Sequence, residues 1–177
     1  MTVLSTARLE LRPVTLEVVD AVLEGRRRTE IEKLIGAEMP WAWPSRALLE
    51  QVFKASLEDI HADPSKRLWG DRLMITKDEP RRVVGSVVFR GRPDAEGRCE
   101  IGYGIEESCQ NQGYGTEALT AIIAWALQQP ECRSIEAMTM AWHKASARVL
   151  EKVGMKLTGK RVDPKLGEML VYAIHRA

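Results

Sequence analysis

The sequence has no long apolar run and no excess of charge of either sign. No stretch approaches the roughly 18 consecutive apolar residues that a membrane-spanning helix needs, so we predict no membrane contact. The 26 basic and 25 acidic residues give a formal net charge of +1. A nucleic-acid-binding domain usually carries a basic excess, and this balance therefore disfavours nucleic acid as a partner.

Cysteine and histidine are also scarce, with three of each. The cysteines are odd in number and show no Cys-x-x-Cys spacing, so we predict neither a disulfide framework nor a metal site. The segment Met1–Leu11 contains Arg8 and Glu10 and lacks the apolar core of a signal peptide. We therefore expect a soluble protein of the reducing cytoplasm.

The chain has an ordinary globular composition, with 177 residues of which 45% are hydrophobic and 29% charged. This length suits one domain, and we predict a single domain over residues 1–177. Apolar periodicity predicts the order β, helices, β-β-β, α, β, α, β-β. The expected strands are Arg8–Arg12, Asp71–Thr76, Val83–Arg90, Arg98–Ile105, Ser134–Met140, Met155–Lys160 and Met169–His175. The expected helices start at or directly after Thr15, Thr29, Ser45, Gly113 and Lys144.

The segment Gln110–Thr116 carries the clearest chemical signal. A predicted strand precedes it and an amphipathic helix follows, with Gly113 and Gly115 in the first turn of that helix. Backbone N–H groups at a helix start are unpaired and partly positive, and glycine lets a ligand approach them closely. The segment therefore predicts a phosphate or pyrophosphate site. The alternative is a helix start that needs its glycines only for packing.

Two known phosphate-binding patterns do not fit this segment. It lacks the Gly-Lys-Ser/Thr of a P-loop and the third glycine of a dinucleotide-binding fingerprint. The strand before it is unusual, because Gly102 and Gly104 share one face while Tyr103 points to the other. Such a bare face beside an anion site can admit an extended ligand. The alternative is a bulge or tight packing against a helix.

Two further segments, Thr6–Pro13 and Ser146–Met155, carry recognisable patterns. Together with Gln110–Gly115, which is similar to a Gln/Arg-x-x-Gly-x-Gly/Ala acetyl-CoA loop, they resemble the GNAT superfamily of N-acetyltransferases. Within it, they resemble the branch that includes the ribosomal-protein N-terminal acetyltransferases. The resemblance covers nearly the whole chain. It implies an α+β GNAT fold with a central, mostly antiparallel twisted sheet of about seven strands flanked by helices.

The resemblance implies that acetyl-CoA is the co-substrate and a primary amine the acceptor. It places the pantetheine arm along Gly104 and Ile105, where a backbone N–H would hold the thioester carbonyl. It adds His143 and Ser146, at the start of a later helix, to the cofactor contacts. The residues that it assigns to the pyrophosphate are Gln110, Asn111, Gln112, Gly113, Tyr114, Gly115 and Thr116.

The acceptor amine must be neutral to attack, so a general base is useful. Glu100, on the bare strand face, is our first candidate and would act through water. Glu117 is the second, and Glu106 becomes a candidate if a bulge shifts the strand register. Each carboxylate is alternatively an ordinary residue of the surface or of a helix start.

Two positions depart from the family pattern. His143 stands where the family usually has Asn, and Leu150 stands where many members have a Tyr that protonates the leaving thiolate. Ser146 is our second catalytic candidate, as a hydrogen-bond donor to the sulfur, and is alternatively a helix cap. His143 is alternatively a solvated side chain at a strand end.

The acceptor side of the site is less well defined. Trp41 and Trp43 lie between prolines, and we expect them to line the acceptor pocket; a lid over the core or a dimer contact is the alternative. The branch resemblance favours a protein or peptide N-terminus as acceptor, and a small-molecule amine stays open. Dimers are common in that branch, although nothing in the chain demands a homodimer. A non-catalytic acyl-CoA-binding or sensing module and a nucleotide-binding protein are the rival classes.

Overall fold

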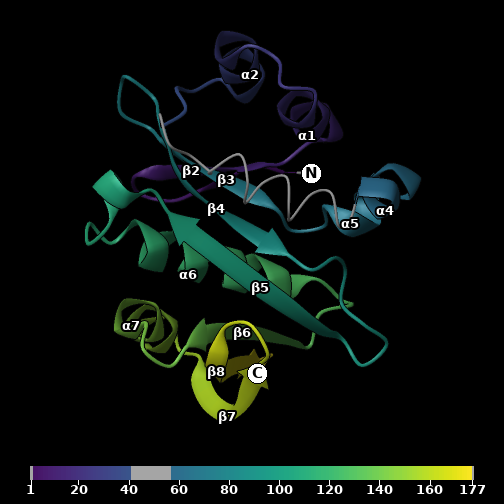
Figure 1. The fold of residues 1–177 in the computed structure, drawn as a ribbon, viewed down its shortest axis with the longest axis vertical. Coiled ribbons are helices and arrows are strands. Elements are labelled where there is room, and N and C mark those ends of the chain that lie inside the picture. Colours follow the sequence, from purple (N-terminus) through teal and green to yellow (C-terminus); the bar gives the residue numbers. More distant parts are fainter. Residues whose placement is uncertain (1, 41–56, 177) are drawn as a thin grey trace.

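The computed structural model describes residues 2–40 and 57–176, and within those ranges eight strands form one sheet (Figure 1). The strands are β1 (Leu4–Ser5), β2 (Leu9–Pro13), β3 (Arg72–Thr76), β4 (Val83–Phe89), β5 (Arg98–Ile105), β6 (Ser134–Met140), β7 (Lys156–Asp163) and β8 (Gly167–His175). The helices are α1 (Leu16–Leu23), α2 (Arg28–Ile35), α4 (Leu57–Ala62), α5 (Pro64–Arg67), α6 (Tyr114–Gln128) and α7 (Lys144–Lys152), with the 3₁₀ turn η1 (Glu107–Cys109). The expected α+β class is confirmed, and the additional strand is the two-residue β1.

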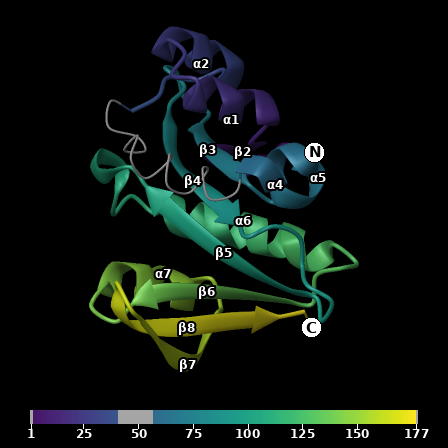
Figure 2. The same ribbon diagram turned by 45° about the vertical axis from the view of Figure 1, so that its right-hand side comes forward.

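The sheet is mostly antiparallel, as predicted. Its strand order is β1-β2-β3-β4-β5-β6-β8-β7, and β5 with β6 is the parallel pair within the described residues. A parallel pair needs a long crossover connection, and here α6 provides it. Figure 2 shows β5 and β6 close together at one end and well apart at their arrowheads. The loop before α6 and the start of α7 follow these two separated ends.

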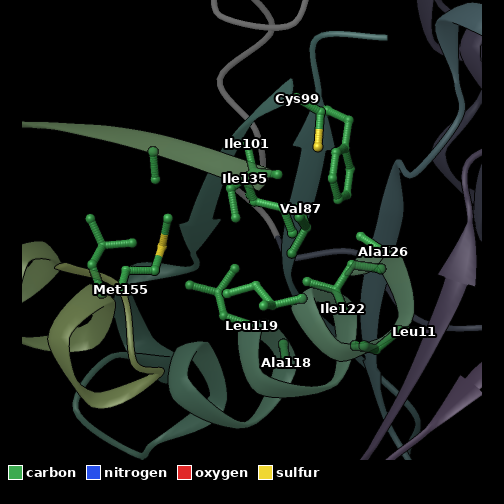
Figure 3. Close-up of a cluster of buried hydrophobic side chains, with 14 of the residues drawn as sticks. Leu11, Val87, Cys99, Ile101, Ala118, Leu119, Ile122, Ala126, Ile135 and Met155 are labelled. Atoms are coloured by element: carbon green, nitrogen blue, oxygen red, sulfur yellow. The ribbon is translucent and has the colours of Figure 1, made fainter. Parts of the chain in front are cut away.

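Each face of the sheet carries its own apolar core. On one face, Leu119 and Ile122 of α6 are fully buried in a cluster with Val87 of β4 and Ile101 of β5 (Figure 3). On the other face, Ile31 of α2 belongs to a second cluster with residues of α1, β3 and β4. Successive side chains of a strand point to opposite faces, so the central strands contribute to both cores.

Two helix predictions differ from the structure. The sequence Thr29–Glu32 has the pattern of a capping box, but this prediction is wrong, because α2 begins at Arg28 without a side-chain cap. Glu32, the expected partner in that box, instead accepts hydrogen bonds from the Met39 N–H and from Arg28 Nε, each at 2.8 Å. The helix expected to start at Ser45 lies mainly outside the described residues, and a separate short helix, α5, follows α4 with Asp63 as its cap.

Candidate functional site

The loop Gln110–Thr116 turns sharply between η1 and α6. Asn111 and Gly113 have left-handed φ angles of 59° and 84°, and such residues curve the backbone so that successive N–H groups converge on one point. Within the described residues, the backbone N–H groups of positions 111 to 116 find no hydrogen-bond acceptor. They lie at the partly positive start of α6, and this arrangement suits an anion.

Side chains of the loop hold its shape from within. Gln110 Nε2 donates to the carbonyl of Ile105 at 3.2 Å, and Gln112 Nε2 donates to the carbonyl of Ser108 at 3.0 Å. Both amides therefore turn back toward β5 and η1. Neither amide is held against the backbone N–H groups of the loop, and the phosphate-binding role of these residues stays a prediction.

Arg8, which directly precedes β2, ties the N-terminal strands to the loop. Its Nη1 donates to the Gln112 carbonyl at 2.9 Å, and its Nε donates to Glu117 Oε2 at 2.7 Å. Its guanidinium also lies 4.5 Å above the centre of the Tyr114 ring. Thr6 Oγ1 donates to Glu117 Oε1 at 2.6 Å. We call these five residues the N-terminal clasp; sequence reasoning missed it, because periodicity cannot reveal contacts between distant segments.

The strands β5 and β6 separate halfway along their length. Their parallel register ends at Ile101 and Ala137, although β5 continues to Ile105 (Figure 2). A Cβ built on Gly104 would meet nothing within 4 Å, so this part of the strand is bare, as predicted. A Cβ on Gly115 would lie 3.5 Å from Ile105 Cγ1, which shows how closely the start of α6 approaches β5.

The start of α7 lies on the other side of this opening. His143 caps the helix, because its Nδ1 accepts the Ser146 N–H at 3.2 Å. Asn commonly performs this capping function, so the cap explains how His143 can replace it. The Tyr103 hydroxyl of β5 donates to Ser146 Oγ at 3.1 Å. Leu150, one turn further along α7, is fully buried.

A cavity of about 1010 Å³ opens beside the separated strands. Its walls come from α4, α5, the end of β4, the middle of β5, β6 and the β7–β8 hairpin. Gly102 and Met138, which directly follow the last β5–β6 pair, line it, and so does Glu100. Glu100 Oε1 forms an ion pair with Arg90 Nε at 2.8 Å, and no described residue donates a hydrogen bond to its Oε2. The cavity therefore presents a carboxylate oxygen near the opening.

The other two candidate bases are placed differently. Burial alone would raise the pKa of Glu117, but hydrogen bonds from Thr6 and Arg8 outweigh it and lower that pKa. Glu117 is thus held in the N-terminal clasp as a carboxylate. The β4–β5 register runs without a shift from Phe89 and Ile101 to Gly85 and Ile105, so the bulge that would favour Glu106 is absent.

Several sequence predictions concern metals, cysteines and the tryptophan loop. Within residues 2–40 and 57–176, no cluster of His, Cys, Asp and Glu side chains is arranged to hold a metal ion. In the same part of the chain, no helix has the length and apolarity needed to cross a membrane. All three cysteines are free. Trp41 and Trp43 lie outside the described residues.

Comparison with known proteins identifies the family of the chain. The profile of the acetyltransferase (GNAT) domain matches residues 8–156. Among proteins similar in sequence is an uncharacterised N-acetyltransferase of Bacillus subtilis, YjdG. It is 29% identical over 167 residues, which cover 93% of this chain and 96% of that protein.

Two solved structures are similar in fold. RimL, a ribosomal alpha-N-protein acetyltransferase in complex with coenzyme A, has a TM-score of 0.67 at 16% identity, over 98% of both chains. A spermidine N-acetyltransferase chimera from Vibrio cholerae and hSSAT has a TM-score of 0.62 at 12% identity, over 96% of this chain and 97% of that chain. Because the family profile spans most of its length, the chain belongs to the GNAT acetyltransferase family.

Proposed function

We propose that the protein transfers an acetyl group from acetyl-CoA to a primary amine. The observation that carries the proposal is the loop Gln110–Thr116, in which the backbone N–H groups of positions 111 to 116 lack acceptors among the described residues and lie beside the opening between β5 and β6. A pyrophosphate is the kind of anion that such a turn at a helix start binds. The coenzyme A complex of RimL, which shares the fold, supports the same ligand here.

The residues around the opening fit an extended arm. A Cβ on Gly113 would lie 3.3 Å from Arg8 Nη2, so a side chain there would crowd the loop, whereas Gly104 leaves the strand surface open. Acetyl-CoA would supply the activated acyl group as a thioester. We propose that Gly104 and Ile105 lie along its pantetheine arm, and that His143 and Ser146 face the arm from α7.

Glu100 is the general base that we propose. It lines the cavity where β5 and β6 begin to separate, and its Oε2 is available to accept a proton through water. An α-amino group has a pKa near 7.7–8.0 and a lysine amine a pKa near 10.4, so the former needs less help to become neutral. The base removes the proton that the nitrogen must lose as the amide forms.

A protein or peptide N-terminus is the acceptor that we favour. The described lining of the cavity includes five acidic and five basic side chains. An acidic excess would attract a polycation, and this balance does not. A small-molecule amine is the second candidate, because a spermidine N-acetyltransferase shares the fold.

A non-catalytic acyl-CoA-binding or sensing module is the alternative function. The observation that favours it is the fully buried Leu150, which provides no proton donor where many relatives of this family have one. Turnover of any amine would contradict this alternative.

Calorimetric titration with acetyl-CoA tests the first part of the proposal. We expect saturable one-to-one binding, and loss of that binding in Gly113→Glu, which puts a carboxylate where the phosphates would lie. Gly167→Glu is the matched control, because Gly167 also has a left-handed φ, of 80°, but is the first residue of β8, directly after the β7–β8 turn, with no atom within 4 Å of its Cβ position. Absence of binding by the unaltered protein would contradict the proposed function.

Thiol release tests the transfer itself. Peptides with different free N-termini and a panel of small amines are incubated with acetyl-CoA, and free coenzyme A is measured. Faster release with N-terminal peptides than with the same peptides blocked at the α-amine supports the favoured acceptor. Release with small amines alone would assign the acceptor to that class, and no release with any amine would favour the sensing module.

A further inference from the structure

Two hydroxyl groups meet at the opening between β5 and β6. Tyr103 Oη, on the separated part of β5, lies 3.1 Å from Ser146 Oγ and 3.4 Å from the Ser146 carbonyl oxygen. Ser146 is in the first turn of α7, which follows β6. The hydrogen bond therefore crosses between the two elements that separate beyond Ile101 and Ala137.

The direction of this hydrogen bond follows from its partners. A carbonyl oxygen only accepts, so the proton of Tyr103 points toward Ser146. The Ser146 N–H is already taken by His143 Nδ1. The Ser146 hydroxyl proton, in contrast, has no acceptor among the described residues. Ser146 can thus donate its own proton to a ligand while Tyr103 donates to Ser146.

The surroundings keep the tyrosine protonated. Burial raises the pKa of Tyr103, and the hydrogen bond with Ser146 offsets only part of that effect. A tyrosine of ordinary pKa, near 10, is already protonated at neutral pH. Tyr103 therefore holds its proton at Oη until a stronger base takes it from the direction of Ser146.

The hydroxyl pair lies between the loop and the cavity. A Cβ on Gly115, in the first turn of α6, would lie 3.6 Å from Tyr103 Cε2, so the tyrosine ring packs against the start of the loop helix. Gly102, the neighbour of Tyr103 in β5, lines the cavity on the opposite strand face. A ligand that extends from the loop to the cavity through this opening must pass Tyr103 and Ser146.

We propose that Tyr103 and Ser146 form a proton relay for the departing thiolate, an inference that rests on the proposed function. As the amine nitrogen bonds to the acyl carbon, the C–S bond breaks and its electron pair goes to sulfur. Ser146 Oγ donates its proton to that sulfur, and Tyr103 Oη donates its proton to Ser146 Oγ. Water restores the proton of Tyr103, and the proton lost by the nitrogen leaves through Glu100.

The two residues have different roles in this relay. Ser146 touches the sulfur and is the catalytic residue, whereas Tyr103 acts through it as a positioning and proton-supplying residue. The fully buried Leu150 follows one turn later on the same side of α7 and brings no donor. Tyr103 of β5 thus provides the phenol group that is missing at position 150 of α7.

The test compares Tyr103→Phe with Tyr172→Phe. Tyr172 is a matched control because its hydroxyl also hydrogen-bonds α7, at 3.1 Å from Glu151 Oε1, but it lies on β8. The first readout is the thiol pKa of bound coenzyme A, followed by the ultraviolet absorbance of the thiolate. Free thiols titrate near 8.5, and the relay lowers this pKa by about one unit because it stabilises the thiolate. Tyr103→Phe abolishes the shift and Tyr172→Phe retains it.

Affinity and rate separate the relay from a merely structural hydrogen bond. Tyr103→Phe changes the coenzyme A affinity by less than about twofold, and it lowers kcat by a factor of about ten or more. The double variant Tyr103→Phe with Ser146→Ala is no slower than Ser146→Ala alone, because both act in one relay. Multiplied losses in the double variant would contradict the relay.

The results that would overturn the relay alone differ from those that would also overturn the proposed function. If the unaltered protein binds coenzyme A with an unshifted thiol pKa, or if Tyr103→Phe keeps the shift and the rate of Tyr172→Phe, the relay is overturned and the proposed function stands. If the unaltered protein does not bind coenzyme A at all, both the relay and the proposed function are overturned.

Discussion

Glu100 and Glu136 lie opposite each other in the β5–β6 register. Both are paired with an arginine, and their side chains are 27% and 32% exposed, respectively. Of the two, Glu100 is the one among the described cavity-lining residues. This pair of similar carboxylates therefore offers a direct test of the proposed base.

We predict that Glu100→Gln lowers kcat/KM for the amine by about a hundredfold or more, because the nitrogen loses its proton acceptor. The affinity for acetyl-CoA should change little, since Glu100 lies away from the loop. Steady-state thiol release and calorimetry measure the two effects. Glu136→Gln should keep near-normal turnover, and an equal loss in both variants would show that the effect comes from the strands rather than from the base.

Asp71, directly before β3, has a buried carboxyl group. It is 5% exposed, and its Oδ1 accepts the Phe89 N–H at 2.6 Å. Burial raises the pKa of Asp71 to about 7, against the lowering effects of the Phe89 N–H and of Arg67 and Arg72. In the unfolded chain the same carboxyl titrates near 3.8. The unfolded state therefore loses its proton first as the pH rises.

The sign of the resulting pH dependence is fixed by this order. Between the two pKa values the unfolded state binds fewer protons, so the free energy of unfolding falls as the pH rises from about 4 to about 7. Asp71→Asn cannot ionise and can still accept the Phe89 N–H. We predict that its stability relative to the unaltered protein improves by a few kcal/mol over that range, measured by urea unfolding at several pH values.

Asp63→Asn is the contrasting control for Asp71. Hydrogen bonds from the Ser65 hydroxyl and the Lys66 N–H lower the pKa of Asp63, the cap of α5. The stabilising effect of Asp63 is present above its unfolded pKa and is lost on acidification, so its pH dependence has the opposite sign. A stability difference for Asp71→Asn that is flat with pH would contradict the raised pKa of Asp71.

At the scale of elements, the N-terminal clasp links β2 to the loop before α6. Arg8 donates to a loop carbonyl and to Glu117 at the start of α6. We predict that Arg8→Ala weakens acetyl-CoA binding by about tenfold, because the loop then samples shapes in which its N–H groups no longer converge. The free protein should lose little stability, since the Arg8 side chain is 44% exposed and exposed ion pairs contribute about 0–1 kcal/mol.

Arg26→Ala is the matched control for Arg8→Ala. Arg26 forms an ion pair with Glu24 at 2.8 Å and is 43% exposed, but it lies just after α1 and its partner Glu24 does not belong to the N-terminal clasp. Calorimetry with acetyl-CoA should give an unchanged dissociation constant for this variant. Equal affinities of Arg8→Ala and Arg26→Ala would show that the loop keeps its shape without the N-terminal clasp.

Structural features that depend on residues close together in the sequence were predictable from the sequence. The separated strand β5 and the loop Gln110–Thr116 were found because glycine spacing and apolar periodicity are properties of short segments. The capping box expected at the start of α2 did not form, because Glu32 has Arg28 and Met39 as its partners. The short β1 was also missed, since two residues carry no period.

Parts of the site that depend on tertiary contacts were beyond sequence reasoning. Tyr103 was predicted to lie on the strand face opposite to the glycines, and only the structure brings its hydroxyl to Ser146. The walls that α4, α5 and the β7–β8 hairpin give to the cavity come from three separate segments. The histidine cap of α7 could have been found, because position 143 directly precedes a predicted helix.

At the scale of the whole molecule, the two apolar cores share their central strands. In β3, Met74 belongs to the core under α6, whereas Leu73 and Ile75 belong to the core under α1 and α2. In β4, Val84 and Val83 divide in the same way. Loss of either core would expose one face of β3 and β4 to water, because each strand is buried on both faces.

We therefore predict that the protein unfolds in one cooperative transition, as the single-domain expectation requires. The ring centroids of Trp69 and Trp125 lie 5.1 Å apart in the cluster under α6. Two of the five tryptophans therefore report on that core by fluorescence, while far-ultraviolet circular dichroism reports on all elements. The two thermal curves should coincide. Two separate transitions would contradict this prediction and would show that the cores unfold independently.

We predict that bound acetyl-CoA raises the Tm of this single transition. A ligand that binds only the folded state stabilises all elements together when they unfold in one step. Acetyl-CoA at about 100 times its dissociation constant contributes about 2.7 kcal/mol, which corresponds to a rise in Tm of roughly 5–10 °C for a chain of this size. Gly113→Glu should melt near the unaltered protein without ligand and show no rise with it. A shift in the unaltered protein that Gly113→Glu keeps would show that the ligand binds somewhere other than the loop.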